Sequence, residues 1–163
     1  MPRLNTREIL RLKTENLHRT LDDSLQVRHI MEPLETCKPD DPAMDVQKLM
    51  KEEHYDVLGV EQKGAVVGYV VHNQLNVGKT TRYMHKFAPG EFIASTTPLI
   101  EVLSLFKDRE WLFVLERTEI RSLVTISDLQ KPPVRMLLFS LISLLEMQLL
   151  QLVDEIRDVL PRG

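Results

Sequence analysis

Residues 122–129 have the types and spacing best suited to binding chemistry. They read Ser-Leu-Val-Thr-Ile-Ser-Asp-Leu, a pattern that predicts a buried strand ending at Thr125 and a helix from about Ser127. The Thr125 hydroxyl would then lie beside the free N–H groups of a helix N-terminus, which suit an anion. Asp128 could accept hydrogen bonds from ribose hydroxyls. Capping by Thr125 or Ser127, with Asp128 favouring the helix dipole, explains the same residues and stays open.

Patterns typical of catalysis or metal binding are missing from the sequence. The histidines at positions 18, 29, 54, 72 and 85 lack metal-ligand spacing, and no serine lies in a nucleophile elbow. The segment 77–80, Val-Gly-Lys-Thr, lacks the earlier glycine of a phosphate-binding loop, since Asn73 stands there. The single cysteine, Cys37, excludes an internal disulfide. We therefore expect no enzymatic activity, no metal and no obligatory cofactor.

Composition narrows the class of protein further. The 163 residues are 43% hydrophobic and 28% charged, with a net charge of -3, which is ordinary for a globular protein and argues against nucleic-acid binding. The apolar segment 137–153 is interrupted by polar residues, and Glu146 at its middle would be costly in lipid. We expect a buried or interface helix there and no membrane partner. A lone cysteine and the lack of a signal sequence indicate a cytoplasmic location.

The order of predicted elements occurs twice along the chain. Strand, helix, strand, strand and short helix are expected at 34–38, from 42, 55–60, 65–71 and 74–75, and again at 92–95, from 98, 111–115, 120–125 and from 127. A shift of 56 positions places Pro42 on Pro98 and Tyr55 on Trp111. After the hairpin turn the shift is 54, as a two-residue deletion in a turn allows. Each unit is too small to bury its apolar face alone, so the two should pack together.

Helices are predicted at both ends of the chain. Asn5 and Glu8 have capping-box spacing at the start of a helix over 5–25. The C-terminal helix begins at Pro132 and carries a wide apolar face at spacings of three and four, which includes Leu138, Leu141, Leu145, Leu149, Leu152, Ile156 and Val159. A face of this width favours burial against a second copy of the chain. The predicted divisions are 1–26, 27–80, 81–131 and 132–163.

This repeat resembles a pair of cystathionine-β-synthase (CBS) domains. The resemblance rests on the closing pattern of 122–129, on the opening segment Val-Arg-His-Ile-Met-Glu-Pro at 27–33, and on the hairpin Lys-Gly-Ala-Val-Val-Gly-Tyr-Val at 63–70. It spans about residues 27–129. It implies an α/β (α+β) fold with two tandem β-α-β-β-α repeats, packed pseudo-symmetrically and flanked by the terminal helices.

The resemblance also implies a function and a site. Such domain pairs are non-catalytic regulatory modules that bind AMP, ADP, ATP or a related adenosyl ligand in a cleft between the repeats. By this resemblance Thr125 and Asp128 would hold ribose and phosphate, and Ile93 and Ala94 would flank the base. The expected ligand is an adenine nucleotide, and the expected protein partners are a second copy of the chain and an unidentified regulated protein.

The first repeat departs from the family pattern. Val71 and Gln74 stand where the second repeat has Thr125 and Asp128, so they offer neither hydroxyl nor charge. Ser122 replaces the glycine that the family usually has there and that the first repeat keeps as Gly68. We expect one competent site per chain at most. The alternative to a sensor is a structural or dimerisation module whose ligand sites are degenerate.

Overall fold

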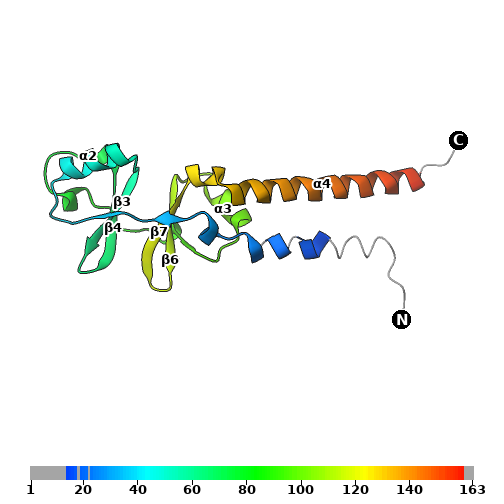
Figure 1. The fold of residues 1–163 in the computed structure, drawn as a ribbon, viewed down its shortest axis with the longest axis horizontal. Coiled ribbons are helices and arrows are strands. Elements are labelled where there is room, and N and C mark those ends of the chain that lie inside the picture. The colour runs from blue at the N-terminus through cyan, green and yellow to red at the C-terminus, as the bar shows by residue number, and fades with distance from the viewer. Residues whose placement is uncertain (1–13, 18, 22, 160–163) are drawn as a thin grey trace.

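The computed structural model of the protein describes residues 14–17, 19–21 and 23–159. Two small units that each combine a sheet with helices lie side by side, and the long helix α4 (Pro132–Val159) extends away from them (Figure 1). The α+β class with flanking terminal helices is confirmed. The capping-box residues Asn5 and Glu8 lie outside the described residues.

The first unit follows the predicted order. Its elements are β2 (Thr36–Cys37), α2 (Ala43–Glu53), β3 (Val57–Gln62), β4 (Ala65–Val71) and the 3-10 turn η2 (His72–Gln74). β2 pairs in parallel with β3, and β3 pairs antiparallel with β4. The short helix predicted at 74–75 is therefore the single turn η2.

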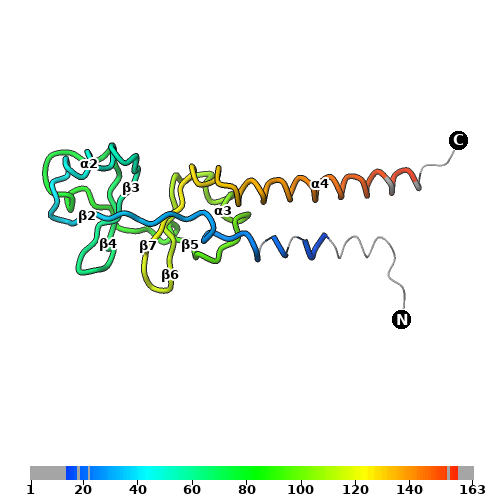
Figure 2. The backbone as a smooth tube through the Cα atoms, viewed as in Figure 1, coloured from blue at the N-terminus to red at the C-terminus, as the bar shows by residue number. Residues whose placement is uncertain are grey.

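The second unit repeats this order and adds one strand. It contains β5 (Phe92–Ala94), α3 (Leu99–Leu105), β6 (Trp111–Glu116), β7 (Glu119–Thr125) and the 3-10 turn η5 (Ile126–Gln130). The sheet order is β1-β7-β6-β5, where β1 (Glu32–Pro33) comes from the opening of the first repeat. The opening segment of the second repeat crosses in the other direction. Its residue His85 forms a β-bridge with Tyr69 on β4 of the first unit. Figure 2 shows the chain from β1 to β2 passing from one unit to the other. The two repeats thus pack by exchanging their opening segments.

The two hairpins match each other residue by residue. Lys63 and Arg117 both take the left-handed backbone conformation at the turn, with φ of 53° and 58°. Each hairpin has a register shift at the same place, after Val60 and after Val114. These pairs are all 54 positions apart in the sequence, so the repeat extends to local backbone geometry.

One predicted correspondence between the repeats is wrong. Val57 pairs with Val71, and Trp111 pairs with Thr125, which makes Val57 and not Tyr55 the counterpart of Trp111. The shift therefore changes from 56 to 54 between the start of the helix and the strand that follows it, and not in the hairpin turn: α3 is four residues shorter than α2, and the loop after it is two residues longer. The net loss of two residues therefore falls at the end of the helix, where a shorter last turn leaves the following strand in register.

Three of the predicted helix starts move by one residue. Pro42 and Pro98 are the N-caps of α2 and α3 rather than their first residues. The Asp41 carboxylate accepts the Lys38 N–H at 2.7 Å and closes the turn before α2. Thr125 is the N-cap of η5, so the helix expected from Ser127 is a 3-10 turn that begins at Ile126.

Apolar side chains form one core in each unit and a third between them. In the first unit α2 packs on its sheet, and in the second α3 does the same with Leu99 and Val102 against Val114 and Val124. The third core joins Leu34, Val57, Tyr69, Val71 and Phe113 from both units. This shared core fixes the position of one repeat against the other and so shapes the cleft between them.

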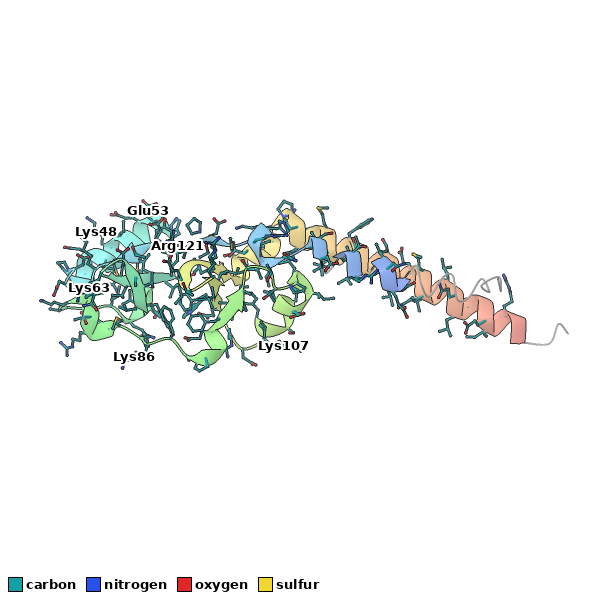
Figure 3. The ribbon with its side chains drawn as sticks, turned by 90° about the horizontal axis from the view of Figure 1, so that it is seen from below. Lys48, Glu53, Lys63, Lys86, Lys107 and Arg121 are labelled. Carbon is teal, nitrogen blue, oxygen red and sulfur yellow. The ribbon has the colours of Figure 1, made fainter. Side chains whose placement is uncertain are left out.

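The helix α4 buries only one side. Val134, Leu137 and Leu144 are buried on it, and Leu21 and Leu25 of the N-terminal helix pack near its start. Two views show the described part of that helix alongside the beginning of α4 (Figures 1 and 3). Within the described residues, α4 is also the one helix long and apolar enough to cross a membrane by length and composition. From the sequence we expect no membrane partner, and a vesicle-binding measurement on the full chain tests this for the exposed helix α4.

Candidate functional site

Thr125 and Asp128 meet at the corner where β7 turns into η5. Asp128 is buried, and its Oδ2 accepts the Thr125 N–H at 2.7 Å and the Thr125 hydroxyl at 3.0 Å. The Thr125 hydroxyl also lies 2.6 Å from that of Ser127. The corner is therefore closed by hydrogen bonds among its own residues, as the capping interpretation predicts.

Lys131 holds this corner to the first repeat. Its Nζ lies 2.9 Å from Asp128 Oδ1, donates to the Ile30 carbonyl at 2.6 Å, and pairs with the Glu32 carboxylate on β1. Burial lowers the pKa of Lys131, but its hydrogen bonds to Glu32 and Asp128 outweigh burial and raise that pKa above its ordinary value. The ammonium therefore stays charged at neutral pH and links the opening segment of the first repeat to the closing corner of the second.

A cavity of about 200 Å³ opens beside the corner, between the repeats. Its wall comes from the opening segment (Glu32, Pro33, Glu35), from the loop between α2 and β3 (residues 54–57), from Glu110 and Trp111, and from Leu123, Thr125, Ser127 and Asp128. Most ligand pockets enclose roughly 300–1,000 Å³. This one has room for a base or a nucleoside and would leave further groups outside. Tyr55 and Trp111 supply half-exposed rings on which a base could stack.

Negative charge dominates the cavity. The carboxylates of Glu32, Glu35, Asp56, Glu110 and Asp128 line it. Lys131 pairs with two of them, and His54 lies in the same wall. An excess of fixed negative charge repels phosphate and attracts neutral or cationic groups. The arrangement can accept hydroxyl hydrogen bonds and stack a ring, but it offers little that would bind several phosphates.

The structure brings together two of the four predicted site residues. Thr125 and Asp128 line the cavity. Ile93 lies in the core of the second repeat and pairs with Val114, and Ala94 pairs with Leu115. The strand β6 separates β5 from β7, so Ile93 and Ala94 do not reach the corner.

Several cavity residues were not expected from the sequence. Glu32 and Glu35 reach the site because β1 crosses to the other sheet, which no local pattern reveals. The one available signal was that Tyr55 and Trp111 are aromatic residues near equivalent places in the two repeats. Two wider depressions, of about 680 and 400 Å³, lie beside Lys107–Trp111 and between the two hairpins. They contain neither Thr125 nor Asp128.

Aromatic side chains fill the equivalent position in the first repeat. Tyr69 stacks on His85 at 5.3 Å between ring centroids and lies 4.9 Å from the Phe113 ring. Its hydroxyl donates to Glu91 at 2.8 Å, and burial together with this bond raises the pKa of Tyr69 to about 12. Gln74, the counterpart of Asp128, lies 2.5 Å from the His85 Nε2 through its Oε1. These contacts fit the prediction that the first-repeat site is weak or empty.

Metal-ligating side chains do not gather in the part of the chain that the structure describes. No group of three or more His, Cys, Asp or Glu side chains there is placed to hold a metal ion. Burial and the nearby Asp41 raise the pKa of Cys37 to about 11, which makes its thiol a poor nucleophile at neutral pH.

Residues 27–75 match the family model of the CBS domain. This match covers the first repeat, and the second repeat, outside the match, has the same element order and strand pairing. CBS domains are generally regulatory and bind ligands. None of the curated proteins matches the sequence significantly.

Solved structures share the fold of both repeats. An uncharacterized conserved protein from Pyrococcus horikoshii superimposes with a TM-score of 0.58 at 23% identity, over 66% of this chain and 90% of that one. A CBS-domain protein of unknown function from Bacillus anthracis gives 0.58 at 11% identity, over 74% and 96%. The CBS domain of a bacterial CNNM/CorC family Mg²⁺ transporter, in complex with ATP, gives 0.55 at 17% identity, over 76% and 96%. At these identities the likeness shows the fold.

Proposed function

We propose that this protein is a non-catalytic regulatory module that binds an adenosyl ligand in the cavity beside Thr125 and Asp128. The observation that carries the proposal is the position of this cavity, at the closing corner of the second repeat and between the two repeats. The ATP complex of a CBS domain with the same fold supports the ligand class. We propose a cytoplasmic location for the module and no obligatory cofactor.

The cavity residues suggest how a nucleoside would bind. The base would stack on Trp111 and Tyr55, and the ribose hydroxyls would donate to Asp128. Each carboxylate oxygen accepts more than one hydrogen bond, so Asp128 could bind ribose while it still accepts the Thr125 N–H. The Thr125 hydroxyl could turn from Asp128 toward the ligand.

Ligand binding in this cavity would affect both repeats. Its walls come from β1 and the loop after α2 on one side, and from β6 and η5 on the other. A ligand that contacts both sides binds best when they are close, so it favours the closed arrangement. α4 begins directly after η5, so it would carry such a change away from the cavity.

The negative charge of the cavity predicts an order of affinity among the candidate ligands. Its carboxylates oppose each added phosphate, so we expect adenosine and the cationic S-adenosylmethionine to bind more tightly than AMP, and AMP more tightly than ATP. Raising the salt concentration should narrow these differences, because it screens the repulsion.

A structural module with degenerate sites is the second candidate. Both oxygens of Asp128 already have partners in Thr125 and Lys131, and Gln74 is paired with His85. Such a protein would keep the fold and bind no nucleotide. One experiment separates the two functions.

That experiment is a thermal-unfolding series with adenosine, S-adenosylmethionine, AMP, ADP, ATP and GMP. A ligand at 100 times its Kd should stabilise the protein by about 2.7 kcal/mol. The stabilisation should disappear in Asp128→Asn, which keeps the size of the side chain, and persist in Gln74→Ala, which changes the matching position of the first repeat. No shift with any ligand in folded wild type would leave the structural module as the function.

A further inference from the structure

The outward side of α4 carries a continuous row of exposed apolar residues. Six of them, from 45% to 57% exposed, are spaced by four, three, four, three and four positions and form what we call the outer seam: Leu138, Ile142, Leu145, Leu149, Leu152 and Ile156. The wide stripe expected from the sequence included Leu141, which is instead half-buried on the inner side. The structure thus divides one stripe into an inner face and an outer seam.

We propose that the outer seam pairs in parallel with the same seam of a second copy of the chain, as a two-stranded coiled coil. Its spacing is the heptad repeat, with Ile142, Leu149 and Ile156 at a positions and leucine at every d position. β-branched residues at a combined with leucine at d favour two parallel strands. Two of the three a positions meet this preference and none is polar.

The neighbouring face of α4 shows why the seam needs a separate partner. Val134, Leu137 and Leu144 are buried there, and the first two belong to the core against which Leu21 and Leu25, at the end of the N-terminal helix, pack. That contact leaves the seam exposed. A second α4 on the seam would complete a bundle of four helices, two from each chain.

The exposed area is sufficient for a stable dimer. Phe139 and Val153, at e positions beside the seam, are 71% and 58% exposed. With the six seam residues they offer on the order of 800 Å² per chain, which is what one partner contributes to a standard interface. The 28 residues of α4 give a helix about 42 Å long.

The residues around the seam argue against a lipid bilayer as its partner. Glu146 and Gln148 lie at flanking positions near the middle of α4, where a charge is costly in lipid. The N-terminal helix beside α4 carries Glu15, Arg19 and Asp23, which would have to enter the bilayer with it. A helix that spans the bilayer with lipid around it needs apolar residues on every side, whereas the row on α4 has the period of a coiled coil.

The mass of the full chain in solution tests the interface. Wild type should have twice the 18.9 kDa of one chain, measured by light scattering after gel filtration. Leu149→Glu should give a monomer, because it places two charges in the seam. Leu150→Glu is the matched control, since Leu150 is 66% exposed but lies one residue off the seam, and it should stay dimeric. Circular dichroism verifies that both variants are folded.

Cross-linking then tests the orientation. In a Cys37→Ala background, Ile142→Cys and Ile156→Cys should each form a disulfide between two copies, because a parallel pair brings identical residues together. A wild-type monomer, a dimer unaffected by Leu149→Glu, or failure of both cysteines to cross-link would overturn the proposal. So would co-sedimentation of wild type with phosphatidylcholine–phosphatidylglycerol vesicles that Leu149→Glu abolishes, since lipid would then be the partner of the seam.

Discussion

The closing corners of the two repeats have the same backbone and different contents. Beside Thr125 and Asp128 the chain leaves a cavity, whereas beside Val71 and Gln74 the rings of Tyr69, His85 and neighbouring aromatic residues pack together. The difference shows that this fold sets where a site can form, and that the side chains around the corner decide whether it stays open.

The segment that contains His85 and crosses to β4 contributes to this difference, because it lies very close to that strand. A Cβ added to Gly68 would lie 2.4 Å from the His85 carbonyl oxygen, so the segment that crosses β4 lies directly on it. The counterpart in the second repeat, Ser122, has a side chain that fits and donates to Glu116 at 2.9 Å. The closer approach in the first repeat brings His85 onto the Tyr69 ring and leaves no room for a ligand.

The largest effect should come from emptying the filled site. Phe113 is fully buried against Tyr69 and Phe87, so Phe113→Ala should lower the free energy of unfolding by about 3–5 kcal/mol. Chemical denaturation measures this loss. Phe113→Leu, which keeps most of the volume, should lose clearly less, and a loss of under about 1 kcal/mol in Phe113→Ala would mean that packing between the repeats contributes little.

The open corner should respond more than the filled one when its polar residue is removed. Asp128→Ala leaves the Thr125 N–H without its side-chain acceptor and removes one of the three partners of the Lys131 ammonium, which should cost about 2–3 kcal/mol of unfolding free energy. Gln74→Ala removes only an exposed contact with His85 and should cost less than about 0.5 kcal/mol. Urea denaturation measures both losses. Similar losses of unfolding free energy at the two positions would contradict the difference between the open and the filled corner.

At alkaline pH the free energy of unfolding should depend on the first strand of the first repeat, which carries a thiol, and not on the first strand of the second repeat. Cys37 occupies the place of Ile93, since they pair with Val60 and Val114 at matching positions. The folded thiol has a pKa near 11 against 9.0 without burial. Between these values the unfolded chain has lost the proton that the folded chain retains, so stability falls as pH rises from about 9 to 11, by about 2 kcal/mol. Below pH 8 the thiol has no such effect.

Cys37→Ala is the control for this pH dependence. It removes the thiol and leaves every other titrating group in place, so its unfolding free energy should fall less steeply over the same interval. Parallel pH profiles for wild type and Cys37→Ala would show that ionisation of the thiol does not contribute.

Sequence patterns predicted the parts of the fold that depend on local order. The strand at 65–71 and the hairpin turns were found because alternation and turn residues act over a few positions. The contribution of Glu32 to the site was not predictable, because it depends on β1 joining the sheet of the other repeat. The distance of Ile93 and Ala94 from the cavity was not predictable for the same reason, since strand order is set by long-range pairing. That Thr125 and Asp128 lie together was predictable because both belong to one short motif, and their role in binding a ligand stays a prediction.

The smallest effect concerns the hydroxyl that completes the filled site. Tyr69→Phe removes the bond to Glu91 and keeps the ring contacts, so the unfolding free energy should fall by about 0.5–1.5 kcal/mol. Because this hydroxyl titrates only near pH 12, the loss should be constant from pH 6 to 9, as measured by urea denaturation. Tyr69→Leu, which installs the residue that the second repeat has as Leu123, should cost more because it also removes the ring. If Tyr69→Phe and Tyr69→Leu were equally unstable, the ring contacts would contribute nothing, and the filled cleft would owe its closure to the hydroxyl alone.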